Sequence, residues 1–137
     1  MNRNDFKELA LIRLKETKTL LESGKYEGAY YLCGYVVECG LKACIAKNTR
    51  RYEFPPDRKT VEAIYQHDLT KLIKAAGLEQ ALDDEIKNIK FDQNWTTAKD
   101  WNEASRYEIK SEKDARDIYS AVADKKDGVL KWIRQHW

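Results

Sequence analysis

The stretch AYYLCGYVVECGLKACIAK, residues 29–47, decides how the rest of the chain must fold. Its apolar residues lie almost all the way round a helix, and a helix without a polar face has to be packed on several sides. A stripe of small residues, Ala29, Cys33, Gly40 and Cys44, would let another helix backbone approach it closely. We therefore predict a central helix that other elements surround.

Two charged residues, Glu38 and Lys42, interrupt this apolar surface one helical turn apart. An acid four residues before a lysine stabilises a helix by only ~0.2–0.5 kcal/mol when the pair is exposed. In so apolar a helix the carboxylate needs a stronger donor, and Arg106 is our candidate because a guanidinium can hold a carboxylate through two parallel hydrogen bonds. Two interpretations stay open: a buried tie of Glu38 with Arg106 and Tyr107, or an ordinary surface pair of Glu38 with Lys42.

The composition indicates one domain over residues 1–137. With 42% hydrophobic and 35% charged residues, the chain is long enough to bury one core and too polar for a membrane protein. No run of 18 apolar residues occurs, and the N-terminal MNRNDFKELA is charged where a signal peptide would be apolar. We expect a cytoplasmic protein.

The three cysteines, Cys33, Cys39 and Cys44, all fall in the central helix, and the chain has only two histidines, His67 and His136. No CxxC pair is present, and three thiols on one helix cannot form a disulfide framework. We expect small, reduced core residues, with no metal site and no cofactor.

The remaining segments also show helical periodicity. Apolar residues recur at helical spacing over residues 6–21, and Gly24 ends that run. A short helix should begin at Asp68, whose side chain can cap it, and end at Gly77. A longer acidic helix follows over about residues 79–95.

Two further signals complete the predicted fold. Pro55 and Pro56 place a loop after the central helix, and Ser111 with Asp114 forms a capping box for a last helix of about 22 residues. Residues 95–111 are too irregular to assign, and no strand pattern appears. The fold class is therefore all-α, an up-and-down bundle of four long helices plus a short helix.

Charge is unevenly distributed although the net charge is only +2. Residues 47–59 hold five Lys or Arg against two acids, residues 125–134 hold four against one, and residues 79–92 hold five acids against two bases. Each basic run could be a solvated surface or a phosphate-binding patch, and we favour the solvated surface. Likewise, Trp132 and Trp137 beside cations could stack bases, but we favour packing.

Three short motifs in a fixed order resemble the HEPN domain family. They are an E-x-x-LK-A helix, an H-D-L helix start and a W-x-x-x-x-RY segment, formed here by Glu38, Leu41, Lys42 and Ala43, by His67, Asp68 and Leu69, and by Trp101, Arg106 and Tyr107. The resemblance covers nearly the whole chain. It implies a helical bundle, usually a homodimer, and one of three roles: an RNA-cutting toxin, the companion of a minimal nucleotidyltransferase, or a nucleotide or RNA binder.

The ribonuclease members of that family carry an Arg followed, after four to six residues, by a His. No Arg of this sequence has a His at that spacing, so we predict no catalytic residue. The candidate ligand-binding residues are the polar and aromatic ones of the three motifs: Glu38, Lys42, His67, Asp68, Arg106 and Tyr107.

We predict a nucleotide- or RNA-binding accessory protein, homodimeric, with a nucleotidyltransferase as a candidate partner in a defence or toxin–antitoxin system. Two alternatives stay open. One is a metal-independent ribonuclease toxin with a non-standard set such as Arg106, His67 and Lys42, because RNA cleavage needs a near-neutral acid or base and a cation. The other is a non-catalytic dimeric protein-interaction module.

Overall fold

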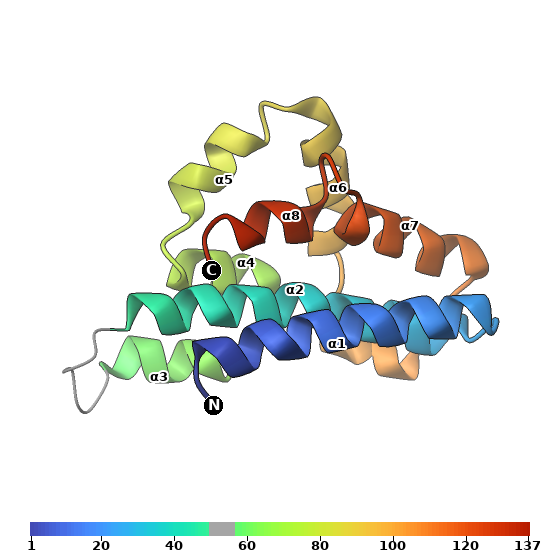
Figure 1. Cartoon of the computed structure of the whole chain (residues 1–137), viewed down its shortest axis with the longest axis horizontal. Helices are drawn as coiled ribbons and strands as arrows, with labels where there is room; N and C mark the ends of the chain where they lie inside the picture. Colours follow the sequence, from blue (N-terminus) through green and yellow to red (C-terminus); the bar gives the residue numbers. More distant parts are fainter. Residues whose placement is uncertain (50–56) are drawn as a thin grey trace.

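The computed structural model describes residues 1–49 and 57–137, apart from the side chain of Lys59. Two long helices, α1 (Arg3–Glu22) and α2 (Tyr26–Asn48), run side by side along the molecule, and the shorter helices lie around them (Figure 1). The shorter ones are α3 (Arg58–Ile64), α4 (Leu69–Ala75), α5 (Glu79–Glu85), α6 (Ile89–Lys99), the 3-10 helix η1 (Glu103–Tyr107), α7 (Glu112–Ala123) and α8 (Val129–Arg134). The described residues contain no strand, which confirms the all-α fold class.

The central position of α2 is confirmed. It contacts α1, α3, α4, α7, α8 and η1, and Glu38 is among its buried residues. The small-residue stripe works as predicted at Gly40, where an added Cβ would lie 2.9 Å from Ile133 Cγ2 of α8. Helix α2 is thus the element that most of the other helices share as a packing partner.

Side-chain caps set several of the helix boundaries. The Asp68 carboxylate accepts hydrogen bonds from the Thr70 and Lys71 backbone N–H groups at the start of α4, and Ser111 forms the predicted capping box with Asp114 at the start of α7. Gly24, with φ of 72°, follows the end of α1 in the left-handed conformation that glycine adopts without strain.

The predicted last helix is not continuous, which is a correction. It is divided into α7 and α8 by a turn at residues 124–128, where the Asp124 carboxylate accepts a hydrogen bond from the Asp127 backbone N–H at 2.9 Å. At Gly128 an added Cβ would lie 2.2 Å from the Asp124 carbonyl oxygen, so the turn needs a glycine there. The periodicity of the apolar residues continues across the turn and hides it.

The predicted acidic helix is also divided, into α5 and α6, because Asn88 caps α6 by accepting from the Lys90 N–H at 3.1 Å. The Asn88 side chain also donates to Asp127 Oδ1 at 2.9 Å, so the two helix breaks are hydrogen-bonded to each other.

Helix α3, capped by Asp57, was not predicted. The predicted loop at Pro55 and Pro56 lies outside the described residues.

The packing interpretation is confirmed for Trp132, which is buried, whereas Trp137 is only partly buried. Trp95 and Trp101 are buried as well. Cys33 and Cys44 are buried and all three cysteines are free thiols. Desolvation raises the pKa of the Cys39 and Cys44 thiols to about 11.

Within the described parts of the chain, no helix is long and apolar enough to cross a membrane.

Gly34 should be indispensable to the fold, because an added Cβ would lie 1.9 Å from Trp101 Cε2. We expect Gly34→Ala to lower the free energy of unfolding by at least about 1–3 kcal/mol through overpacking. Gly28→Ala on the same helix is the control, since its Cβ would meet only Leu20 Cδ1 at 3.5 Å, and we expect a gain of up to ~1 kcal/mol. Urea unfolding of both variants measures the difference, and equal stabilities would contradict this packing.

Candidate functional site

The Glu38 carboxylate is the centre of a polar cluster inside the fold. Only 3% of its side chain is exposed. Its Oε1 accepts a hydrogen bond from Lys42 Nζ at 2.8 Å and lies 2.9 Å from His67 Nδ1. Both sequence interpretations of Glu38 therefore need correction: the pair with Lys42 is buried rather than superficial, and the second partner is His67 rather than Arg106.

His67 lies in the three-residue connection that leads into α4, just before the capping residue Asp68. Glu38 orients the ring from one side, and on the other side His67 Nε2 lies 3.3 Å from Glu103 Oε2 of η1. The ring thus bridges a buried carboxylate on α2 and an exposed one on η1. A ring protonated at both nitrogens can donate to both carboxylates, whereas a neutral ring can donate to only one of them.

Aromatic side chains form the wall behind the imidazole. The Tyr35 ring lies edge-on to the His67 ring with centroids 6.3 Å apart, and edge-on to the Trp101 ring at 5.1 Å. The hydroxyls of Tyr35 and Tyr31 are hydrogen-bonded at 3.0 Å. These contacts hold the His67 ring in one orientation, which a ligand-binding side chain requires.

Polar atoms without partners are concentrated around this cluster. Among the described residues, four buried side-chain nitrogen or oxygen atoms lack a hydrogen-bond partner, and three of them are Glu38 Oε2, Trp101 Nε1 and Ser105 Oγ. A buried polar atom that also lacked a water partner would cost about 1–3 kcal/mol of stability. Atoms of this kind are rare in folded proteins and call for an explanation such as a functional role.

A surface hollow of about 540 Å³ opens in front of His67. Two connections form it, the one from α3 to α4 and the one from α6 to η1. Its walls carry an exposed ring, amides, carboxylates and one lysine: Tyr65, Gln66, His67, Asp68, Thr70, Lys99, Asp100, Trp101, Asn102 and Glu103. The hollow is therefore polar, and its acids outnumber its cations.

The other predicted site residues lie at the margin of this arrangement. Asp68 lines the hollow, and hydrogen bonds from the Thr70 side chain and the backbone N–H groups of Lys71 and Thr70 lower its pKa. Arg106 and Tyr107 are exposed on η1, with the guanidinium carbon 4.8 Å from the Tyr107 ring centroid. The structure thus brings Glu38, Lys42 and His67 together and leaves Arg106 outside that group.

Sequence reasoning missed several residues of the site. Glu103 and Asn102 lie in the segment that could not be assigned, and Tyr35 reads as one more apolar residue of the central helix. Tyr65 and Gln66 directly precede the H-D-L motif. Their position next to His67 in the sequence is the signal that could have identified them as site residues. Among the described residues, no group of three or more His, Cys, Asp or Glu side chains could hold a metal ion.

A family model for the HEPN domain matches residues 4–136 of the chain. The chain therefore belongs to the HEPN domain family, as its motifs indicated. Domains of this family commonly dimerise, and membership indicates a function related to nucleotides or RNA in general. Comparisons with curated proteins and with solved structures found no match.

Replacing the Glu38 carboxylate should be far more costly than replacing an exposed one. Glu38→Gln leaves Lys42, only 12% exposed, and His67 without their charged acceptor, and we expect a loss of about 3 kcal/mol in unfolding free energy. Asp117→Asn removes the acid from the exposed pair with Lys113, also four residues apart, and should cost less than ~0.5 kcal/mol. Urea unfolding measures the free energy of unfolding of both variants. If Glu38→Gln lost no more unfolding free energy than Asp117→Asn, the buried cluster would be refuted.

Proposed function

We propose that this HEPN domain is a non-catalytic accessory protein that binds a nucleotide, or an unpaired base of RNA, in the hollow at His67. One observation carries the proposal. The hollow combines a fixed imidazole, an exposed aromatic ring, two side-chain amides and several carboxylates in a single concave surface. Proteins recognise unpaired bases with these groups, by stacking on a ring and hydrogen bonding to the base edges.

The individual side chains fit the parts of a nucleoside. Tyr65 is 77% exposed, so its ring is free to stack on a base. Gln66 and Asn102 offer amide donors and acceptors for the base edge, and the Glu103 carboxylate can accept hydrogen bonds from ribose hydroxyls. Buried Glu38 orients the ring of His67 and does not itself touch the ligand.

The charges in the hollow favour a ligand whose phosphate lies at the rim. Asp68, Asp100 and Glu103 face only Lys99 and His67, so a phosphate deep inside would be repelled. Exposed Arg106, on the same 3-10 helix as Glu103, is the guanidinium proposed to hold the phosphate, with Tyr107 beside it. In this proposal His67, Asp68, Arg106 and Tyr107 face the ligand, whereas Glu38 and its partner Lys42 act only through the position of His67.

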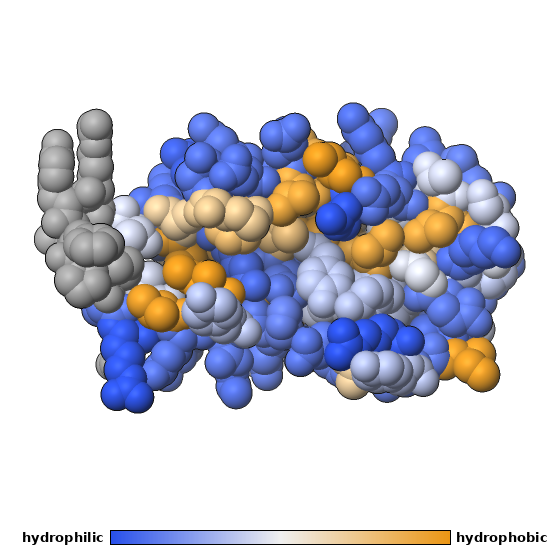
Figure 2. All heavy atoms as spheres, turned by 90° about the horizontal axis from the view of Figure 1, so that it is seen from below, coloured by the Kyte–Doolittle hydropathy of each residue, from blue (hydrophilic) through white to orange (hydrophobic). Residues whose placement is uncertain are grey.

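The proposed biological setting follows from the family resemblance. A minimal nucleotidyltransferase is the partner proposed for the accessory role, in a defence or toxin–antitoxin system. The proposed assembly is a homodimer. Exposed apolar residues of α1 and α3, Ile12, Val61 and Ile64, support a second copy as the partner of the face that these helices share. Figure 2 shows hydrophobic side chains gathering on this face, the lower one of Figure 1.

Adenosine monophosphate is the simplest probe of the hollow. We expect adenosine monophosphate to bind the wild-type protein. Tyr65→Ala should weaken binding at least about fivefold, because stacking contributes about 1–3 kcal/mol per base. Glu103→Ala should also weaken binding at least about fivefold, because the hydrogen bonds to the ribose are lost. Glu108→Ala is the matched control, since Glu108 and Glu103 side chains are both 48% exposed and Glu108 pairs with Lys110 outside the hollow. Isothermal titration calorimetry measures the affinities. No binding at millimolar nucleotide, or equal affinities of all variants, would overturn the proposal.

The homodimer is tested by mass in solution. Multi-angle light scattering should give twice the chain mass of 16.1 kDa, and Ile12→Lys with Ile64→Lys should return the protein to the monomer mass, because lysine ammonium groups cannot be buried there unpaired. Ile89→Lys, at a residue that is 73% exposed on α6, is the control and should leave the dimer intact. A monomeric wild-type protein would contradict the proposed assembly.

A further inference from the structure

Four cationic side chains meet around the C-terminal residue Trp137. Lys7 Nζ of α1 and the guanidinium carbon of Arg134 each lie 5.6 Å from the centre of its indole ring. Arg3 Nη2 donates to the Trp137 main-chain oxygen at 2.8 Å, and Lys47 Nζ, at the end of α2, donates to the His136 carbonyl at 3.5 Å. Residues far apart in sequence thus form one surface, the cationic face: Arg3, Lys7, Lys47, Arg134 and Trp137.

No acidic side chain of the described residues neutralises the charge of this face, although the Trp137 main-chain oxygen accepts a hydrogen bond from Arg3. Among the described residues, no side-chain carboxylate lies within ion-pair distance of Arg3, Lys7, Lys47 or Arg134. The pKa of Lys7 is lowered by partial desolvation and then by the charges of Arg3 and Lys47. Arg3 Nε is the fourth buried polar atom without a partner. Cations clustered without a nearby acidic side chain create a positive potential that attracts anionic ligands.

The face continues into a groove of about 310 Å³ between α1 and the α7–α8 turn. Leu14, Val122 and Leu130 contribute apolar side chains to it, and Lys125, Lys131 and Arg134 contribute cations. One acid, Asp124, also lines the groove, but its carboxylate already accepts the Asp127 backbone N–H. The groove therefore extends the unpaired positive charge along the molecule.

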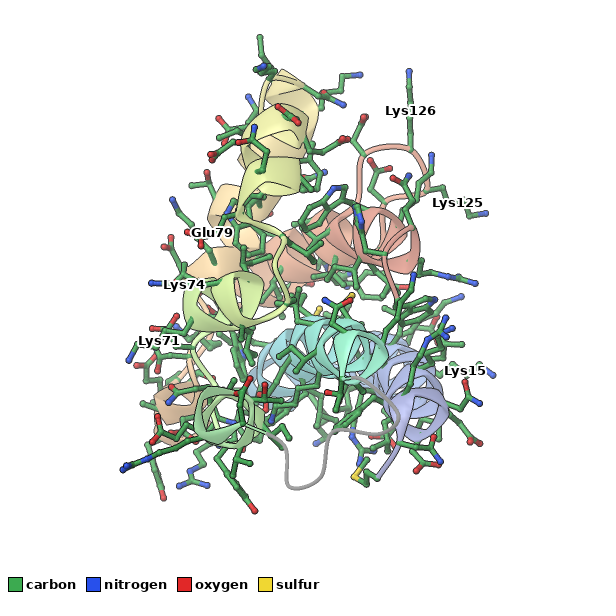
Figure 3. The ribbon with its side chains drawn as sticks, turned by 90° about the vertical axis from the view of Figure 1, so that its left-hand side faces the viewer. Lys15, Lys71, Lys74, Glu79, Lys125 and Lys126 are labelled. Atoms are coloured by element: carbon green, nitrogen blue, oxygen red, sulfur yellow. The ribbon has the colours of Figure 1, made fainter. Side chains whose placement is uncertain are left out.

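Further lysines point outward on the side of the protein where Lys125 lines the groove. Figure 3 shows Lys15, Lys125 and Lys126 pointing outward on the side of α1 and α8, whereas Lys71, Lys74 and Glu79 point outward on the opposite side. The basic run at residues 125–134, which the sequence left open between a solvated surface and a phosphate-binding patch, is thus joined by cations from α1 and α2.

We propose that the cationic face and its groove bind the phosphate backbone of single-stranded RNA. Beyond the four cations that meet around Trp137, Lys125 and Lys131 continue the positive charge along the groove, and such an extended surface fits a chain of phosphates better than a single phosphate. Trp137 holds the Lys7 and Arg134 side chains over its ring, so less side-chain entropy is lost when they contact phosphates. A positively charged groove with aromatic side chains is the usual means of binding single strands.

The inference rests on the proposed function only for the choice of RNA as the polymer. The hollow at His67 would hold a base or a mononucleotide, whereas the cationic face would hold backbone phosphates with little dependence on sequence. The two sites share no residue. Variants of one site therefore leave the other unchanged, and each proposal can fail without the other.

The test uses a fluorescein-labelled single-stranded RNA of mixed sequence, about 12 nucleotides long, with fluorescence anisotropy at several salt concentrations. We expect Lys7→Gln with Arg134→Gln to weaken binding at least tenfold and to reduce the slope of log affinity against log salt by about 1.4, since each lost phosphate contact removes about 0.7 for a single strand. Trp137→Leu should weaken binding severalfold with an unchanged slope, because all the cations remain. Circular dichroism verifies that each variant is folded.

Lys71→Gln with Lys74→Gln is the matched control, with the same change of charge on the opposite side of the molecule, and it should bind RNA like the wild type. Equal losses in the two double variants would overturn the proposal, because they would reflect net charge only. Poly-glutamate bound as tightly as RNA would overturn the RNA assignment in favour of an acidic protein partner. If Tyr65→Ala abolished RNA binding and Lys7→Gln with Arg134→Gln did not, the RNA would bind at the hollow, and the proposal for the cationic face would be refuted.

Discussion

The fold and the candidate site both depend on the burial of one carboxylate. Glu38 lies in the most enclosed helix of the structure, where an unpaired charge would be prohibitively costly, so Lys42 and His67 must stay beside it. Lys42 comes from the same helix, but His67 comes from the start of α4 and reaches on to Glu103 of η1. The requirement to pair Glu38 thus fixes two irregular connections against α2, and the hollow lies between these connections.

The central helix also links the two proposed sites. Glu38 in its middle anchors the hollow, and Lys47 near its C-terminal end belongs to the cationic face. The hollow offers carboxylates and amides, the face offers unpaired cations, and an RNA strand has a counterpart for each: bases and ribose for the first, phosphates for the second. Such a division allows one protein to bind a base specifically and a backbone without regard to sequence.

Much of the fold could be predicted because its signals are local. Each of these signals depends on a few neighbouring residues, and the structure confirms all of them: the apolar surface of α2, the caps at Asp68 and Ser111, and the end of α1 at Gly24. The breaks at Asn88 and Gly128 escaped prediction although the Asn88 cap and the glycine are local features, and the sequence does not show the hydrogen bond from Asn88 to Asp127 that joins the two breaks. The apolar periodicity alone continues across both breaks.

The site was predictable only in part for the same reason. The motifs identified Glu38, Lys42 and His67, but the pattern gave no means of deciding that His67, 29 residues from Glu38, would be its partner instead of Arg106. The cationic face could not be predicted at all from one segment, since Arg3 and Arg134 come from opposite ends of the chain. Their proximity is a consequence of how α1 and α8 pack around α2.

The most direct test of the central claim is the nitrogen NMR spectrum of the two histidines during titration with adenosine monophosphate. The account predicts that the Nε2 resonance of His67 shifts on binding while its Nδ1, held by Glu38, changes little, and that His136, whose carbonyl accepts from Lys47 outside the hollow, reports any binding of the phosphate near the cationic face. Unchanged His67 resonances at saturating nucleotide, or a shift confined to His136, would contradict it.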